Sequence, residues 1–486
     1  MRLGVINGMV ATLLLTAVAC IRFSPEGRIE AQADVWSAPY TLSTDGGALK
    51  TERWWLVFQD AQLERLINTA LTNNLSLVQA EARLRQARAL ARQAGAAARP
   101  EITASATVGS SLQRAQAPGR SSYATSTWET YGLGLAGSYE LDVWGRVAAQ
   151  RNVAEADVRA NQYDLATVAM TVAAEIAQYY FNWLAQAQTV KLLEQQVATN
   201  KQVLDLMVAR YAGAQATALD VLQQQNILAQ TTALLPNARA EEQILQQQLN
   251  VLMGLAPQTA LVLQSPEFPG LPLMPATGLP SALLTNRPDV QAALTRLEGA
   301  GWQISAAKAE RLPALRLTAS AVTSSDKVAS LFDDWLANVA GNLAAPLLDG
   351  GRRVAEVERV RAMEDEKVGA FRAVFLDAVF EVESAMVREQ RQRETIIEME
   401  KQLQLLQRTR AESTRRYSRG MESYLAVLTA ELGVQAQARS LIQARNSLLK
   451  ARVQLYRALG GDWLSLVKSL ENVEGKKELD GDGNKE

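Results

Sequence analysis

The stretch "LDVWGR" at Leu141–Arg146 has a counterpart in "LDGGRR" at Leu348–Arg353, 207 positions further along the chain. Each copy follows a segment of alternating residues and precedes a long run almost free of Gly and Pro. Glycine permits a backbone bend that branched residues resist, and an aspartate before a helix can accept hydrogen bonds from its first N–H groups. We therefore predict strand-to-helix junctions formed by Asp142, Gly145, Asp349, Gly350 and Gly351.

The run after each junction predicts a very long helix. Arg146–Ala212 contains neither Gly nor Pro over 67 residues, which is roughly 100 Å of helix at about 1.5 Å per residue. Arg352–Arg419 contains one glycine, and second helices follow at Ala214–Met253, where Pro236 is expected to interrupt the helix, and at Met421–Leu459. Helices that return through tight turns form antiparallel hairpins, so we expect one long hairpin in each half of the chain.

The two halves repeat the same landmarks at one offset. Tyr211 and Tyr417 lie 206 positions apart, and so do Gly254 and Gly460, which end the matching stretches "QLNVLMG" and "QLYRALG". Between the halves, residues 254–280 hold six of the 14 prolines and cannot continue a helix. The sequence therefore predicts an internal duplication joined by a linker.

Short alternating segments precede each junction. Ile102–Gly109 and Leu133–Leu141 alternate in the first half, and Leu315–Ser320 and Val339–Ala345 do so in the second. Segments of this kind suit tilted membrane strands of roughly 9–11 residues, although a soluble sandwich would show the same alternation. Membrane barrels start at about eight strands, and an open sheet edge in lipid is costly. Four membrane strands would therefore require several chains to share one barrel.

The amino-terminal residues read as an export signal. Arg2 precedes an apolar stretch that is too short to span a membrane, and the only cysteine, Cys20, follows it. The segment resembles a bacterial lipoprotein signal, although Ala17 stands where Leu is preferred. An ordinary secretory signal with an incidental cysteine is the alternative. Ile21, rather than Asp, after the cysteine favours the outer membrane. No later stretch of 18 apolar residues lacks a charge, so we predict no transmembrane helix.

The composition argues against enzymatic chemistry. The chain has no His, which is the commonest general base and metal ligand, and a single Cys cannot form an intrachain disulfide. The glycines Gly132 and Gly134 lack the rest of a dinucleotide-binding motif. The 50 basic and 51 acidic residues nearly cancel, so a nucleic-acid partner is not expected. We predict that the chain is not an enzyme and needs no cofactor or metal.

Several motifs together resemble the TolC-like outer-membrane efflux proteins, in particular the lipoprotein branch that partners resistance-nodulation-division pumps. These motifs are "WWLVFQD" at Trp54–Asp60, "YELDVWGR" at Tyr139–Arg146, "RPDV" at Arg287–Val290 and "PLLDGGR" at Pro346–Arg352. The resemblance implies an α+β membrane protein that forms a homotrimer. Each chain would give four strands to a twelve-stranded barrel, and duplicated helical hairpins would continue it as an α-barrel.

The function implied by the resemblance is a passive exit duct in the outer membrane. A periplasmic adaptor and an inner-membrane pump would load the substrate, and the duct would need no cofactor. Two alternatives stay open: a lipid-anchored periplasmic coiled-coil scaffold, and the exit duct of a type I protein-export system. The sequence does not name the cargo.

The resemblance places a constriction at the periplasmic helix turns. Leu425 would lie in an apolar ring that narrows the tunnel, although it could equally pack in the hairpin core. Asp220 is retained in the first half, whereas Ala426 and Thr429 stand where relatives often carry Asp, so an acidic ring is in question. Tyr417 and Gly420 belong to the same turn. Five nearby arginines would either be solvated or contact an adaptor or the neighbouring tips; these are Arg408, Arg410, Arg415, Arg416 and Arg419.

The expected organisation has six parts. They are a signal peptide at 1–19, an acylated extended segment at 20–60, a first repeat at 61–253, a linker at 254–280, a second repeat at 281–465 and a disordered tail at 466–486.

Overall fold

The computed structural model describes residues 23–24, 40, 53–116, 123–263, 267–275, 277, 280–461 and 463–465. The expected signal peptide, Cys20 and the tail at 466–486 lie outside the described residues. The chain divides into two compact units. Unit 1 comprises residues 1–31, 84–161 and 293–371, and unit 2 comprises residues 32–83, 162–292 and 372–486.

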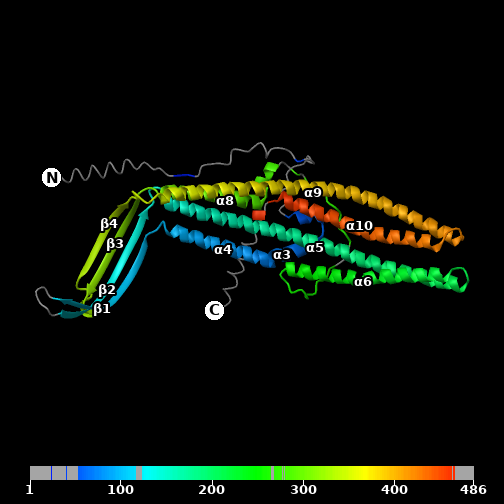
Figure 1. Cartoon of the computed structure of the whole chain (residues 1–486), viewed down its shortest axis with the longest axis horizontal. Helices are drawn as coiled ribbons and strands as arrows, with labels where there is room; N and C mark the ends of the chain where they lie inside the picture. The colour runs from blue at the N-terminus through cyan, green and yellow to red at the C-terminus, as the bar shows by residue number, and fades with distance from the viewer. Residues whose placement is uncertain are drawn as a thin grey trace. The chain divides into compact units, whose positions relative to one another are not determined.

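The order of elements is the same in both halves (Figure 1), except that η4 lies between the two strands of the second half. The first half contains η2 (Trp54–Phe58), α3 (Ala61–Asn73), α4 (Leu75–Ala96), β1 (Glu101–Gln116), β2 (Tyr123–Leu141), α5 (Arg146–Ala212) and α6 (Ala218–Leu252). The second half contains η3 (Pro280–Ala282), α7 (Leu283–Asn286), α8 (Pro288–Ala309), β3 (Ala314–Ser325), η4 (Val328–Ser330), β4 (Trp335–Ala344), α9 (Arg352–Ser418) and α10 (Tyr424–Leu459).

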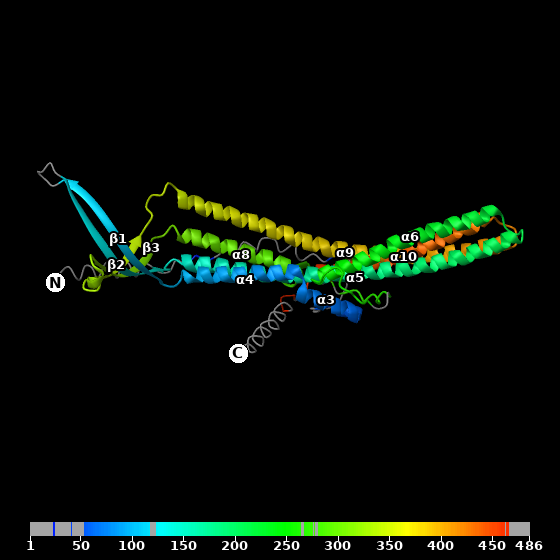
Figure 2. The same cartoon turned by 90° about the horizontal axis from the view of Figure 1, so that it is seen from below.

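Unit 1 contains one antiparallel sheet in the order β1-β2-β3-β4. The β1–β2 pairing runs from Glu101 opposite Ser138 to Gln116 opposite Tyr123, and the two strands form a long ribbon (Figure 2). These strands, of 16 and 19 residues, are longer than the alternating segments suggested, because pairing continues through polar stretches. The outer strands β1 and β4 each pair with only one neighbour within the chain.

The long helices begin and end where Gly and Pro punctuate the sequence. Helices α5 and α9 each contain 67 residues, and each is followed by a helix of 35 or 36 residues. The expectation that Pro236 interrupts the second helix was wrong, because α6 continues through it. A proline removes one backbone donor, and the many remaining hydrogen bonds of a long helix tolerate that loss.

Unit 2 holds an aromatic core near the start of the described chain. The Trp54 ring stacks on Tyr456 with centroids 5.5 Å apart, and Phe58 lies 5.4 Å from Phe181. All four side chains are buried, so the "WWLVFQD" motif joins the start of the chain to α5 and α10. Among the described residues, no helix combines the length and the apolar character needed to cross a membrane.

Candidate functional site

The two hairpins of unit 2 meet at their turns, residues 213–217 between α5 and α6 and residues 419–423 between α9 and α10. We call these turns and the adjoining helix ends the tip. Its core comprises Met207, Ile227, Tyr424 and Leu428, all at most 5% exposed. The Tyr417 ring lies 5.2 Å from the Tyr424 ring and packs against this core. The tip therefore has a packed interior built from both hairpins.

A buried polar contact joins the hairpins inside this core. The Tyr424 hydroxyl on α10 donates to Oε1 of Gln224 on α6 at 2.8 Å, and Nε2 of Gln224 donates to the Asn200 carbonyl on α5 at 2.8 Å. The Gln435 side chain on α10 donates to Oδ1 of Asn200 at 3.1 Å. Burial raises the pKa of Tyr424, so its hydroxyl remains a donor at neutral pH.

Leu425 lies outside this core although it follows Tyr424 directly. Its side chain is 57% exposed, and Leu219, which occupies the equivalent place in the first hairpin, is 62% exposed. The hydroxyl of Thr429 donates to the Leu425 carbonyl at 2.9 Å, so Thr429 bonds to its own helix. Two leucines per chain thus present apolar surface from the turns.

Asp220 is used to begin a helix. Its carboxylate accepts the Thr217 N–H at 2.8 Å, and its own N–H donates to the Thr217 hydroxyl at 3.2 Å, which is a capping box. The second hairpin has Ser423 and Ala426 at the equivalent positions, and the Ser423 side chain makes no capping bond. An acidic residue at this capping position is therefore present in one hairpin only, where it stabilises a helix start.

Gly420 closes the second turn with a φ of 71°, a conformation that favours glycine. The arginines nearby divide into two groups. Arg410 pairs with Glu431 at 3.3 Å, Arg415 pairs with Glu412, and Arg416 lies 3.6 Å from Glu412. Arg408 and Arg419 have no ion-pair partner within the part of the chain that the structure describes.

The first strand-to-helix junction is held by Asp142. Its carboxylate accepts the N–H groups of Val147 and Ala148 at 3.0 and 2.8 Å, which are among the first of α5. Gly145 has a φ of 74°, where a side chain would be strained. The Trp144 indole donates to the Pro313 carbonyl at 2.6 Å and links this junction to the start of β3.

The second junction has the same design. The Asp349 carboxylate accepts the N–H groups of Gly351 and Arg353 at 3.1 and 3.3 Å, and it forms an ion pair with the Arg353 guanidinium at 3.1 Å. Gly350 and Gly351 have φ values of 65° and 84°. Asp142 and Gly145 thus lie together before the start of α5, and Asp349 lies with Gly350 and Gly351 before the start of α9.

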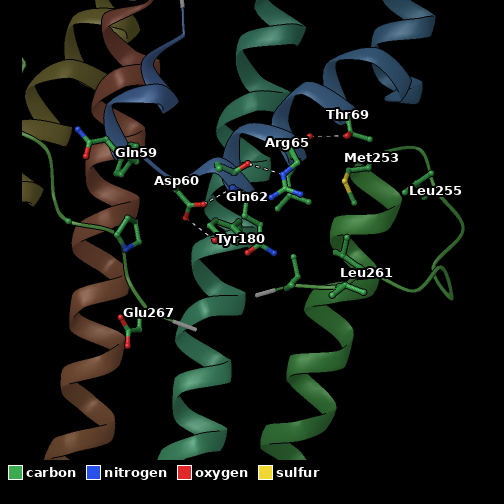
Figure 3. Close-up of a pocket in the computed structure, with 17 residues that line it drawn as sticks. Gln59, Asp60, Gln62, Arg65, Thr69, Tyr180, Met253, Leu255, Leu261 and Glu267 are labelled. Atoms are coloured by element: carbon green, nitrogen blue, oxygen red, sulfur yellow. Dashed lines mark hydrogen bonds between the residues drawn. The ribbon is translucent and has the colours of Figure 1, made fainter. Parts of the chain in front are cut away.

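A cavity of about 680 Å³ in unit 2 lies beside η2, α3 and the segment after α6 (Figure 3). Asp60 faces it, and its Oδ1 accepts the N–H groups of Gln62 and Leu63 at 2.9 and 3.0 Å. Its Oδ2 accepts the Tyr180 hydroxyl at 2.8 Å. Both oxygens of the carboxylate therefore serve structural bonds.

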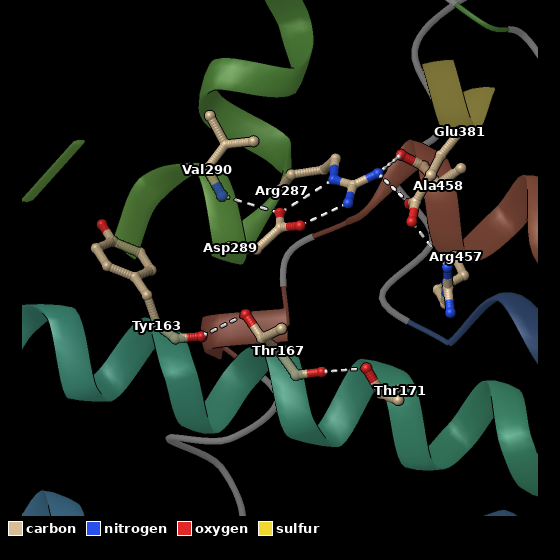
Figure 4. Close-up of polar contacts among 9 residues, drawn as sticks. All are labelled: Tyr163, Thr167, Thr171, Arg287, Asp289, Val290, Glu381, Arg457 and Ala458. Carbon is tan, nitrogen blue, oxygen red and sulfur yellow. Dashed lines mark hydrogen bonds and ion pairs between the residues drawn. The ribbon is translucent and has the colours of Figure 1, made fainter. Parts of the chain in front are cut away.

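The "RPDV" motif holds three helices together (Figure 4). The Arg287 guanidinium, which is buried, pairs with Asp289 at 2.5 Å and with Glu381 of α9 at 2.8 Å, and it donates to the Ala458 carbonyl near the end of α10 at 3.1 Å. Burial lowers the pKa of Arg287, but these bonds outweigh burial and raise it. From the sequence alone, this arginine had no expected role beyond its place in a motif shared with the family.

Sequence reasoning missed the buried polar residues of unit 2. Gln224, Asn200 and Gln435 are at most 3% exposed, and the sequence analysis assigned none of them a role. The available signal was their placement at positions that otherwise continue an apolar stripe. No group of acidic or thiol side chains in the described residues could hold a metal ion.

Long helical hairpins in two duplicated halves, together with a four-stranded antiparallel sheet, are the features of an outer-membrane channel subunit. The sequence model of the outer membrane efflux protein family matches residues 66–255 and 279–461. The chain therefore belongs to this family. It is 33% identical over 436 residues to the pyoverdine export outer membrane protein OpmQ of Pseudomonas aeruginosa, covering 88% of this chain and 90% of OpmQ. It is 28% identical over 420 residues to the toluene efflux pump outer membrane protein TtgF of Pseudomonas putida, covering 84% and 85%.

Solved structures show the same architecture. The outer-membrane channel OprN matches with a TM-score of 0.82 at 25% identity, covering 91% of this chain and 99% of OprN. The chain is thus an outer-membrane exit duct for tripartite efflux. It assembles as a homotrimer with four strands per chain in a twelve-stranded barrel, extends into the periplasm, and works with a periplasmic adaptor and an inner-membrane pump.

Proposed function

We propose that the duct is passive and that apolar side chains at the tip control its opening. Leu425, with Leu219 as its counterpart, forms the constriction in the trimer. The observation that carries this proposal is the exposure of Leu425, 57%, between the core residues Tyr424 and Leu428. A leucine that the hairpin core leaves uncovered is available to meet its copies across a narrow tunnel, where apolar surface excludes water and ions.

Single-channel conductance of the assembled trimer in planar bilayers tests the constriction. Leu425→Ser should raise the conductance because it replaces apolar bulk with a small polar group. Leu405→Ser serves as the matched control, because Leu405 is 61% exposed on α9 but lies away from the turn. An unchanged conductance of Leu425→Ser in a correctly assembled trimer would remove this residue from the constriction.

The duct takes its cargo from the pump and does not select it. OpmQ and TtgF carry pyoverdine and toluene in their names, two chemically unrelated cargoes, yet both resemble this chain over more than four fifths of its length. A duct fold that serves such different cargoes has no need of a selective binding site. The absence of His from the whole sequence further supports a role without catalysis.

The junction residues and Cys20 are assigned structural and anchoring roles. Asp142 and Asp349, with Gly145, Gly350 and Gly351, turn each strand into a helix. Cys20 carries the acyl chains that fix the amino end to the membrane. Cys20→Ser should abolish incorporation of labelled palmitate, whereas retained label in that variant would contradict the anchor.

A further inference from the structure

A groove of about 480 Å³ in unit 1 lies between the end of α8 and the first turns of α9. Three basic side chains, those of Lys308, Arg311 and Arg361, line it, and one acidic side chain, that of Glu358, accompanies them. The groove therefore carries a net positive charge, unlike the chain as a whole, whose formal charge is −1.

Two of these cations lack a carboxylate partner. Arg311 and Arg361 are exposed, and neither lies within 4 Å of an acidic oxygen among the described residues. Neighbouring arginines of α9 are paired, since Arg353 meets Asp349 at 3.1 Å and Arg359 meets Glu356 at 2.7 Å. Among the described residues, the charges of Arg311 and Arg361 are thus not balanced by a carboxylate.

The floor of the same groove is apolar. Leu312, Val354 and Val357 line it together with Phe23. Val357 is 4% exposed and anchors the floor, whereas Val354 is 47% exposed and open to a further apolar partner. A lining that combines cationic and apolar side chains suits a ligand that combines an anionic group with hydrocarbon.

The groove lies at the level where helices give way to strands. Arg311 falls between the end of α8 at Ala309 and the start of β3 at Ala314. Side chains of a helix point back toward its amino end, so Arg361 leans toward the start of α9, where the strands end. Because the strands of this family lie in the outer membrane, the groove faces the periplasmic surface of the bilayer.

Phe23, which lines the groove, lies close in sequence to Cys20, the expected lipid anchor. Cys20 precedes Phe23 by three positions, and three residues span at most about 10 Å. Acyl chains on Cys20 would therefore enter the membrane next to the groove.

We propose that this groove binds the headgroup of an anionic phospholipid from the inner leaflet of the outer membrane. Lys308, Arg311 and Arg361 contact the phosphate and its substituent, and the lipid chains cover Val354 and Leu312. The inference rests on the outer-membrane location and is independent of the tip constriction.

The test uses the full-length trimer in nanodiscs that contain equal amounts of phosphatidylglycerol and phosphatidylethanolamine. The trimer is extracted in mild detergent, and the lipids that remain bound are quantified by mass spectrometry. The wild-type trimer should retain phosphatidylglycerol preferentially. Lys308→Gln/Arg311→Gln/Arg361→Gln should lower that preference at least about fivefold, which corresponds to about 1 kcal/mol, the contribution of one basic residue near an anionic membrane surface.

Lys201→Gln/Arg372→Gln/Arg388→Gln is the matched control. It also removes one lysine and two arginines that are exposed, but these lie on α5 and α9 within unit 2. The control should retain the wild-type preference. Arg311→Gln alone, at an exposed position, replaces the triple variant if that variant fails to assemble.

Three outcomes would overturn the proposal. The first is a wild-type trimer without lipid preference, and the second is a triple variant that keeps the preference. The third is displacement of the lipid by soluble glycerol phosphate, which would make the groove a simple anion site. Conductance in bilayers of neutral lipid is recorded in parallel and should stay unchanged in the triple variant, so failure of the lipid site is distinguishable from failure of the duct.

Discussion

Gly254 lies against the backbone of Asn73 so closely that a β-carbon at position 254 would come within 2.2 Å of the Asn73 carbonyl oxygen. The second half repeats the relationship, since a β-carbon on Gly460 would come within 2.3 Å of the Asn286 carbonyl oxygen. Both glycines have positive φ values, 71° and 78°. The duplication read from the sequence therefore corresponds to two equivalent close contacts, each between the end of a hairpin and the last residue of a shorter helix in the same half, α3 or α7.

Gly254→Ala should destabilise the protein strongly. The left-handed backbone costs a non-glycine residue roughly 1–3 kcal/mol, and the contact with Asn73 must open as well. The midpoint of thermal unfolding in detergent, followed by circular dichroism, measures the effect. Gly369→Ala is the opposite control: nothing lies within 4 Å of its added β-carbon, and alanine favours the helix by roughly 0.5–1 kcal/mol. A Gly254→Ala variant as stable as the wild type would contradict the close contact.

Arg452 and Glu389 form a fully buried ion pair at 2.5 Å, and Arg452 also donates to the carbonyl groups of Pro272 and Leu273 at 2.5 and 2.8 Å. Arg452→Met should cost about 3 kcal/mol, because the buried Glu389 carboxylate loses its buried partner and keeps the pair with the more exposed Arg393 at 2.8 Å. Chemical denaturation in detergent, compared with the wild type, measures the loss. Arg445→Met breaks the exposed pair with Glu400 and should cost no more than about 1 kcal/mol. Equal losses of stability in Arg452→Met and Arg445→Met would contradict the importance of the buried ion pair.

The long helices could be predicted because their limits depend on local chemistry. Arg146–Ala212 has no residue that breaks a helix, and the aspartates and glycines of the two junctions mark where α5 and α9 begin. The strand lengths were underestimated because only the stretches that alternate apolar and polar residues were taken as strands, although pairing with a neighbouring strand keeps the adjoining polar residues extended. The prediction that Pro236 interrupts α6 failed for a related reason. The packing of a long helix outweighs the local effect of one proline.

The polar core of the tip could not be predicted, because burial depends on which helices meet. The contacts of Gln224 and Asn200 exist only when α6 and α10 pack against α5, and no local pattern predicts that packing. The position of Leu425 was open for the same reason. Leu425 is the next residue after the buried Tyr424, and only the packed hairpins decide which of the two side chains enters the core.

Tyr424→Phe should loosen the tip. The change removes the hydroxyl but keeps the ring, so the carbonyl oxygen of the buried Gln224 side chain loses its donor at a cost of roughly 1–3 kcal/mol. We expect a higher single-channel conductance and more frequent opening. Tyr417→Phe is the matched control, because the Tyr417 hydroxyl meets only the Met207 sulfur at 3.7 Å, a weak acceptor. Identical recordings from both variants would show that the bond to Gln224 does not restrain the tip.

The same hydroxyl predicts a sensitivity to strong base. Burial raises the pKa of Tyr424 above its ordinary value of about 10, so the folded protein keeps this proton at pH values where the unfolded chain has lost it. The stabilisation is therefore complete below about pH 10 and declines as the pH rises further. Between about pH 9.5 and 11.5, the unfolding midpoint of the wild type should fall more steeply than that of Tyr424→Phe, which has no proton to lose at this position. Parallel curves for the two proteins would contradict a buried, protonated Tyr424.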